Sequence, residues 1–223
     1  SFGFRPGRSA HDAVRQSKKF IQRGFRFVVD LDIEKFFDRV NHDMLMARIA
    51  RRIDDKAVLK LIRRYLQSGA MLNGVCVIGE EGVPQGGPLS PLLANIILDD
   101  LDKELEKRGH CFSRYADDCN IYVRKKRSGD RVRASITEFL ARKLKLKVNE
   151  SKALLTGLTI GNFWIQLFEN GNKENSIAPA SLKKLKAKIR EMTIPRSGIS
   201  FSDRTRSLSR YMTGWIGYYA LAE

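Results

Sequence analysis

The chain has 223 residues, of which 43% are hydrophobic, enough for one substantial core or two small ones. Lys and Arg number 41 against 25 Asp and Glu, and this net charge of +16 indicates a polyanionic partner, nucleic acid before an anionic membrane. No apolar run reaches the roughly 18 residues of a transmembrane helix, and the start does not resemble a signal peptide. The three cysteines lack CxxC spacing, which favours a reducing compartment over a disulfide framework or a zinc site.

Hydrophobic spacing in the first 170 residues predicts an α+β domain. A helix over 9–23 has Ser9 as its expected N-cap, and Asn73-Gly74 predicts a hairpin turn within 71–78. Loops are expected at 82–87 and, with four basic residues, at 124–127. The other expected helices are 42–53, 57–65, 88–105 and 132–140, and the expected strands are 25–31, 112–115, 120–123, 144–148, 153–158 and 163–168.

The composition changes near residue 170, where we place a domain boundary. Pro179 and Ser181 open a helix whose apolar face carries Leu182, Leu185 and Ile189, with lysines on the other faces. A linker over 195–199 then leads to a last helix through residues 208–215. We therefore expect residues 1–170 to form the α+β part and residues 171–223 a small, basic, all-helical part.

Two adjacent aspartates, Asp117 and Asp118, interrupt the expected strands in "RYADDCNIYV". Aspartate is common in turns because it bonds its own backbone, so a simple turn is one interpretation. A doubled carboxylate in a tight apolar hairpin repels itself, however, unless a cation lies there. Mg²⁺ takes oxygen ligands, few of them from protein, and phosphates supply the rest.

A second carboxylate element occurs in "FRFVVDLDIEKFFD". Strand alternation places Asp30 and Asp32 on the same face, two residues apart. Together with the Asp117-Asp118 turn, this strand predicts a site for two metal ions that assists phosphoryl transfer.

Four segments in this order, "DLDIEKFFD", "EGVPQGGPLSPLLANIILDDL", "SRYADDCNIYV" and "LKLKVNESK", resemble the palm motifs of reverse transcriptases encoded by bacterial group II introns. The opening "SFGFRPGRSAHDAV" resembles the segment that precedes the palm. The ending, "SLKKLKAKIREMT…RSLSRYMTGWIGYYA", is similar to the maturase-specific thumb. The resemblance covers nearly the whole chain and implies a palm with an antiparallel sheet, followed by a helical thumb.

For the palm, the resemblance implies that Asp32 and Asp117 ligate Mg²⁺, with Mn²⁺ as an alternative, and that Asp118 is a supporting ligand. Asp30 would be a neighbour rather than a ligand. Phe37 would lie under the incoming sugar and leave no room for a 2′-hydroxyl. Tyr115 would contact or support the primer end.

Two further segments take roles from the same resemblance. In "GVPQGGPLSP", Gln85 and Gly86 would contact the pair formed by template and incoming nucleotide, because glycine lets the backbone approach closely. Lys152 in "NESKA" would lie near the triphosphate and protonate the leaving group. An ordinary glycine turn and a solvent-exposed lysine are the alternative interpretations.

The sequence also departs from the family pattern. It begins inside that pattern, without the fingers segment that carries basic residues for the triphosphate, so we expect a fragment or a truncated product. Ala153 stands where a hydroxyl residue is usual, and the primer-grip strand is represented only by "LTIGNFWI". Nothing predicts target-site cleavage.

A second hypothesis makes the chain mainly a maturase, an RNA-binding splicing cofactor whose polymerase activity is secondary or absent. Its basis is the cationic segment with Lys183, Lys184, Lys186, Lys188 and Arg190, which forms a surface for a phosphate backbone. The expected partners are group II intron RNA, an RNA template with a DNA primer, and deoxynucleoside triphosphates.

A third hypothesis is a related lineage, such as a diversity-generating or CRISPR-associated reverse transcriptase, which the thumb resemblance disfavours. The resemblance implies a bacterial cytoplasmic protein that does not bind membranes. Both a monomer and a dimer agree with the sequence.

Overall fold

The computed structural model describes residues 1–67, 70–72, 75–77, 82–83, 87–149, 155–157, 165–167, 175–177, 179–194 and 200–219. The chain forms two compact units, Ser1–Gly157 and Leu158–Glu223. The boundary expected near residue 170 lies outside the described residues.

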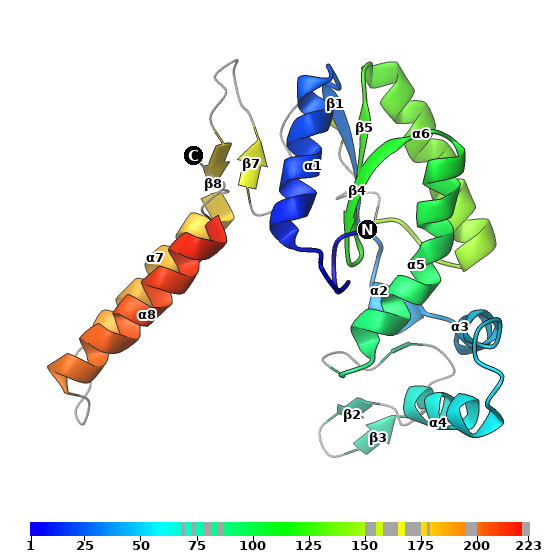
Figure 1. Ribbon diagram of the computed structural model, residues 1–223, viewed down its shortest axis with the longest axis horizontal. Helices are drawn as coiled ribbons and strands as arrows, with labels where there is room; N and C mark the ends of the chain where they lie inside the picture. Colours follow the sequence, from blue (N-terminus) through cyan, green and yellow to red (C-terminus); the bar gives the residue numbers. More distant parts are fainter. Residues whose placement is uncertain are drawn as a thin grey trace. The chain divides into compact units, whose positions relative to one another are not determined.

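The first unit contains a four-stranded antiparallel sheet in the order β4-β5-β1-β6 (Figure 1). Its strands are β1 Phe27–Leu31, β4 Cys111–Tyr115, β5 Asp118–Val123 and β6 Leu155–Gly157. Strands β2 Ala70–Leu72 and β3 Val75–Val77 pair as the expected hairpin, whose Asn73-Gly74 turn lies outside the described residues. The helices of this unit are α1 Ala10–Gln22, α2 Phe36–Arg39, α3 His42–Ile49, α4 Lys56–Gln67, α5 Ser90–Lys107 and α6 Lys126–Phe139.

The two faces of the sheet differ because side chains alternate along each strand. One face is apolar, and α5 and α6 cover it, burying Leu101, Ile121 and Ile136 completely (Figure 1). The other face is more polar and packs against α1, where the Tyr122 hydroxyl donates to Ser17 Oγ at 2.6 Å. Ser9 caps α1 as predicted, and the Asp12 carboxylate accepts from the Ser9 backbone N–H in return.

Several predicted elements of the first unit are corrected. The strand expected over 144–148 is wrong: a π-helical turn, η1 Leu140–Leu144, continues α6, and only Val148 makes a β-bridge, to Ile33. The alternating pattern that suggested a strand does correspond to alternating burial, because Leu144, Leu146 and Val148 are buried. Lys126 and Arg127 were expected in a loop but begin α6. Helix α3 ends at Ile49, before the expected residue 53, and α2 was not predicted.

The second unit contains the strands β7 Ile165–Leu167 and β8 Asn175–Ile177, which pair antiparallel, and the helices α7 Pro179–Thr193 and α8 Phe201–Tyr219. Strand β8 lies in the part that was expected to be all-helical, so that expectation is wrong before Pro179; the helices among the described residues that follow are α7 and α8. The half-buried side chains of α7 include Leu182, Leu185 and Ile189, in agreement with the predicted apolar face. None of the helices in the described residues is long and apolar enough to cross a membrane.

Candidate metal centre and nucleic-acid interface

The strand register brings the predicted carboxylates to one end of the sheet. In the β4–β5 hairpin, Tyr115 pairs with Asp118, so Ala116 and Asp117 form the two-residue tip and Asp118 begins β5. Strand β1 pairs Leu31 with Cys119, and Asp32 follows directly after this last pair, as Asp118 precedes it. Asp32 and Asp118 therefore lie at the same end of the sheet as the hairpin tip that carries Asp117.

Asp30 precedes Asp32 by two residues, so strand alternation puts it on the same face of the sheet, where it pairs with Asn120 of β5. The Asp30 side chain is buried, and its Oδ1 has no hydrogen-bond partner among the described residues. Burial, together with the nearby charges of Asp118 and Asp32, raises the pKa of Asp30 to about 7. The same-face prediction for Asp30 and Asp32 agrees with this register. Asp30, Asp32 and Asp118 thus lie close enough at this end of the sheet for their charges to influence one another.

Asn149 orients Asp32, although no local sequence pattern marks it for that role. Its side-chain Nδ2 donates to Asp32 Oδ2 at 3.1 Å, and its backbone N–H donates to the Asp32 carbonyl at 2.8 Å. The neighbouring Glu34 N–H donates to the Lys147 carbonyl at 2.8 Å. Segment 147–149 therefore runs alongside 32–34 and fixes the direction of the first carboxylate.

Arg114 supports the hairpin tip from beneath. Its guanidinium is fully buried and binds Asp102 of α5 through two hydrogen bonds, each 2.7 Å long. The same group donates to the Ala116 carbonyl at 2.6 Å and to Asn95 Oδ1 at 3.1 Å. Ala116 has a φ of 57°, an uncommon conformation for a residue with a Cβ atom. Helix α5 thus holds the turn that carries Asp117.

The opening residues of the chain close against the same tip. The Phe2 N–H donates to the Arg114 carbonyl at 2.7 Å, and Asn95 Nδ2 donates to the Gly3 carbonyl at 2.9 Å. A Cβ atom on Gly3 would lie 2.5 Å from the Ala116 nitrogen, so only glycine fits there without a shift. The half-buried Tyr115 ring lies 6.0 Å from that of Phe4, between centroids.

Phe37 lies half-buried in α2, against the edge of the core. Its carbonyl accepts from the Val83 N–H at 2.6 Å, and the Gly82 N–H donates to the Val40 carbonyl at 2.8 Å. Gly82 has a φ of 100°, which a residue with a side chain rarely adopts. The segment that leads toward Gln85 and Gly86 therefore leaves from beside Phe37. Gln85, Gly86 and Lys152 themselves lie outside the described residues.

The predicted RNA-binding residues lie on α7, in the second unit. Lys183, Lys184, Lys186 and Arg190 are exposed, whereas Lys188 is half-buried and pairs with Glu191 at 3.0 Å. On α8, the ring centroids of Trp215 and Tyr219 lie 4.5 Å apart, and both residues are half-buried. The cations of α7 form a solvent-exposed surface of the kind that attracts a phosphate backbone.

In the described part of the chain, no group of three or more His, Cys, Asp or Glu side chains is arranged so that it could hold a metal ion. Mg²⁺ does not need one, because it binds through one or two carboxylates and completes its shell with water and phosphate. The carboxylates at this end of the sheet fit an ion of this type, as does the buried Asp30 Oδ1, which has no hydrogen-bond partner among the described residues.

The comparison with family models agrees with this geometry. Residues 1–191 match the family described as Reverse transcriptase (RNA-dependent DNA polymerase). The chain belongs to this reverse transcriptase family. Residues 182–223 match the Group II intron, maturase-specific domain, so the chain belongs to the group II intron type of this family.

Curated relatives of this reverse transcriptase include Protein YkfC of Escherichia coli strain K12, which is 41% identical over 113 residues, 48% of this chain and 29% of that protein. The Group II intron-encoded protein LtrA of Lactococcus lactis subsp. cremoris is 43% identical over 103 residues, 46% of this chain and 17% of that protein. The chain therefore matches less than a third of the length of either relative.

Solved structures share the fold at low sequence identity. Telomerase from Candida albicans, solved with a fragment of telomeric RNA, has a TM-score of 0.56 at 13% identity, covering 96% of this chain and 42% of the telomerase. Apo telomerase from Candida tropicalis has a TM-score of 0.52 at 14% identity, covering 71% of this chain and 34% of that one. The predicted fold class, a reverse-transcriptase palm in a mixed helix and strand domain, is confirmed.

Proposed function

We propose that this reverse transcriptase extends a DNA primer on an RNA template, within the life cycle of a group II intron. The observation that supports the proposal is the strand register that brings Asp32 and Asp118 to the end of the sheet where Asp117 forms the hairpin tip. Paired carboxylates at the ends of neighbouring strands are suited to phosphoryl transfer, because they hold cations against the phosphates of a substrate.

Asp32, Asp117 and Asp118 would hold Mg²⁺, or Mn²⁺ in its place. When bound, two such ions activate the primer 3′-hydroxyl and stabilise the pyrophosphate that leaves. Asn149 holds the Asp32 carboxylate in one orientation, and Arg114 fixes the carbonyl of the residue before Asp117. The fixed geometry limits the reorganisation needed at each nucleotide addition.

Other side chains would select and place the nucleotide. Phe37 would exclude a 2′-hydroxyl, so that deoxynucleoside triphosphates are preferred. Tyr115 would support the primer end, since its ring lies in the hairpin directly before the tip. Gln85 and Gly86 would contact the template–nucleotide pair, and Lys152 would protonate the leaving group.

The second unit would bind the intron RNA and assist splicing. Its supporting observation is the exposed basic surface of α7, formed by Lys183, Lys184, Lys186 and Arg190, with Lys188 beside them. The match to the maturase-specific domain favours the same role. An alternative within this proposal is a chain that acts mainly as a splicing cofactor.

The test is Mg²⁺-dependent extension of a DNA primer on an RNA template by the chain and by Asp117→Ala. We expect extension by the parent and at least a 10²-fold loss in the variant, the order that removing one charge-stabilising group costs an enzyme. Extension that persists in Asp117→Ala would contradict the site. If neither protein extends the primer, retained binding to intron RNA would favour the splicing-cofactor alternative.

A further inference from the structure

A second group of cationic side chains lies at the opposite end of the same sheet. Its members come from the end of α1, the start of β1 and the connection from β5 into α6. All are exposed. We call this group the distal basic patch; it consists of Arg23, Arg26, Arg124, Lys125, Lys126 and Arg127.

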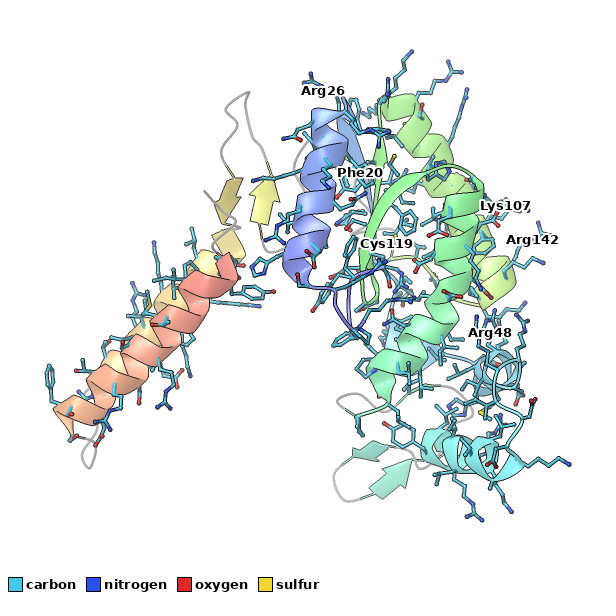
Figure 2. The ribbon with its side chains drawn as sticks, in the orientation of Figure 1. Phe20, Arg26, Arg48, Lys107, Cys119 and Arg142 are labelled. Carbon is cyan, nitrogen blue, oxygen red and sulfur yellow. The ribbon has the colours of Figure 1, made fainter. Side chains whose placement is uncertain are left out.

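Backbone pairing brings these segments together. The Arg26 N–H donates to the Val123 carbonyl at 3.1 Å, at the last residue of β5. The Arg124 guanidinium lies over the Phe25 ring, 5.3 Å from its centroid. Figure 1 shows the corresponding ends of α1, β1, β5 and α6 at one end of the unit, and Figure 2 labels Arg26 there. The segments that carry the patch therefore meet at this end of the sheet.

Among the described residues, none of the members of the distal basic patch forms an ion pair with a carboxylate. Asp130, the first acidic residue of α6, forms none with them in this part of the chain either. Elsewhere on this unit several cations are paired, as in Arg48 with Asp100 at 2.6 Å and Lys103 with Asp99 at 2.7 Å. What distinguishes the patch from other exposed cations of this unit is the gathering of six cationic side chains where three neighbouring segments meet.

Helix α6 adds to the positive potential. Its first residue is Lys126, its N-cap is Lys125 without a side-chain capping bond, and its first turn carries no acidic residue. The N-terminal end of a helix is the positive end of its dipole, where anions are favourable and cations unfavourable. The arrangement opposes folding by self-repulsion, and an external anion would relieve it.

The patch is separate from the carboxylate end. Strand β5 runs from Asp118 to Val123, which spans roughly 17–20 Å at about 3.4 Å per residue. A phosphate bound at Arg124 therefore does not reach the carboxylates.

We propose that the distal basic patch binds the phosphate backbone of a folded RNA, outside the template–primer site. The proposal rests on the proposed function in taking RNA as the polyanion. Arginine dominates the patch, and its planar guanidinium matches phosphate geometry. Membrane-surface binding pairs basic residues with exposed aromatic or aliphatic side chains, and the exposed large hydrophobic residues of the described chain lie elsewhere, at positions such as Phe4 and Leu61.

The experiment compares two variants of the full chain that remove the same amount of charge. The patch variant carries Arg26→Gln, Arg124→Gln, Lys126→Gln and Arg127→Gln. The control carries Lys56→Gln, Lys60→Gln, Lys107→Gln and Lys143→Gln at other exposed positions. Binding of a fluorescein-labelled RNA hairpin with a long duplex stem is measured by anisotropy over a series of KCl concentrations, and primer extension is measured in parallel.

For the patch variant, we expect the slope of log K against log salt to fall by about 0.9 for each phosphate that the variant no longer neutralises, and the affinity to fall roughly tenfold or more at low salt. The control should bind nearly as the parent does. Primer extension on a short template should be unchanged in both. The milder variant Arg26→Gln/Lys126→Gln should show about half of the change in slope, which guards against misfolding of the larger variant.

Equal weakening in the patch variant and the control would overturn the proposal, because net charge alone would then explain the binding. Unchanged RNA binding together with abolished binding to phosphatidylserine vesicles would overturn it in favour of a membrane surface. A parent chain that binds the hairpin through the patch but extends no primer would support the patch and contradict only the proposed polymerase.

Discussion

The carboxylate end of the sheet and the helices α7 and α8 hold their charges in opposite ways. At the hairpin tip, Arg114 is fully buried, and each nitrogen of its guanidinium donates to Asp102, Asn95 or Ala116. On α7, Lys183 and Lys184 are exposed to solvent. Charges of the first kind fix atoms in position and respond little to salt, whereas charges of the second kind attract a polyanion and are screened by salt.

From this contrast between buried and exposed charges, we predict that the stability of the hairpin end depends on the buried ion pair of Arg114 with Asp102. Asp102→Asn leaves the Arg114 guanidinium buried without a counter-charge, which should lower the free energy of unfolding by about 3–5 kcal/mol. Urea unfolding checks this value. The exposed pair of Arg142 with Glu138 is the control, and Glu138→Gln should change stability by about 1 kcal/mol or less. Equal effects of the two substitutions would contradict the contrast between the regions.

A second prediction uses the pH dependence of Asp30. Its pKa in the folded chain is about 7, above the ordinary 3.8, so the folded state favours the protonated carboxyl. Stability from this group is therefore present near pH 4 and is lost as the pH rises through 7. In EDTA, Asp30→Asn should match the parent near pH 4 and exceed it at pH 8 by up to about 4 kcal/mol, from roughly three pK units of 1.36 kcal/mol each. A variant less stable than the parent at pH 8 would contradict this environment.

A third prediction concerns the fit of Gly3 against the hairpin tip. Gly3→Ala places a methyl group 2.5 Å from the Ala116 nitrogen, which is too close, so the backbone of the tip must shift, and we expect Asp117 to move with it. A shift of about 1 Å in a catalytic group can cost roughly 10²-fold in rate, and we expect a fall of that order in the rate of primer extension. Gly109→Ala is the control for an added methyl group, because its Cβ would meet nothing within 4 Å, although its φ of 69° strains that variant as well. Full activity in Gly3→Ala would show that the tip tolerates displacement.

The smallest expected effects concern α7. Substitution of Lys183, Lys184 and Lys186 with Gln should weaken binding by about the same factor whatever the sequence of the RNA. The slope of log K against log salt concentration should fall by roughly 0.9 for each phosphate that is no longer neutralised. Lys188→Gln should change binding less, because Glu191 already pairs with that ammonium group. Affinity measurements over a salt series test both. A larger effect from Lys188 than from Lys184 would contradict the assignment of the exposed cations.

Much of the candidate site could be predicted from the sequence because it depends on short-range patterns. Alternation alone put Asp30 and Asp32 on one face, and the β-forming residues around Asp117 predicted the hairpin. The supporting residues could not be found this way. Asp102 and Arg114 meet only because α5 packs on the sheet, and no local pattern marks that pairing.

The wrong and the missing predictions also arise where the structure depends on contacts between segments far apart in the chain. Leu144, Leu146 and Val148 alternate in burial as a strand does, but the backbone at Leu144 is still helical, and Lys145 leaves the helix with a φ of 56°. Asn149 lies within the segment "LKLKVNESK", yet its role depends on a bond to Asp32 that joins segments far apart in the chain. A single glycine in the sequence does not show why glycine is needed there. The close approach of Gly3 to Ala116 and the positive φ of Gly82 are seen only in the folded chain.

The most direct test measures extension and RNA binding together on two variants, Asp117→Ala and the triple substitution of Lys183, Lys184 and Lys186 with Gln. We predict that Asp117→Ala loses Mg²⁺-dependent extension and keeps RNA affinity, while the triple variant loses affinity and still extends a primer supplied at saturating concentration. Loss of both properties in both variants, with folding intact, would contradict the division between a carboxylate end that performs chemistry and a helical surface that binds RNA.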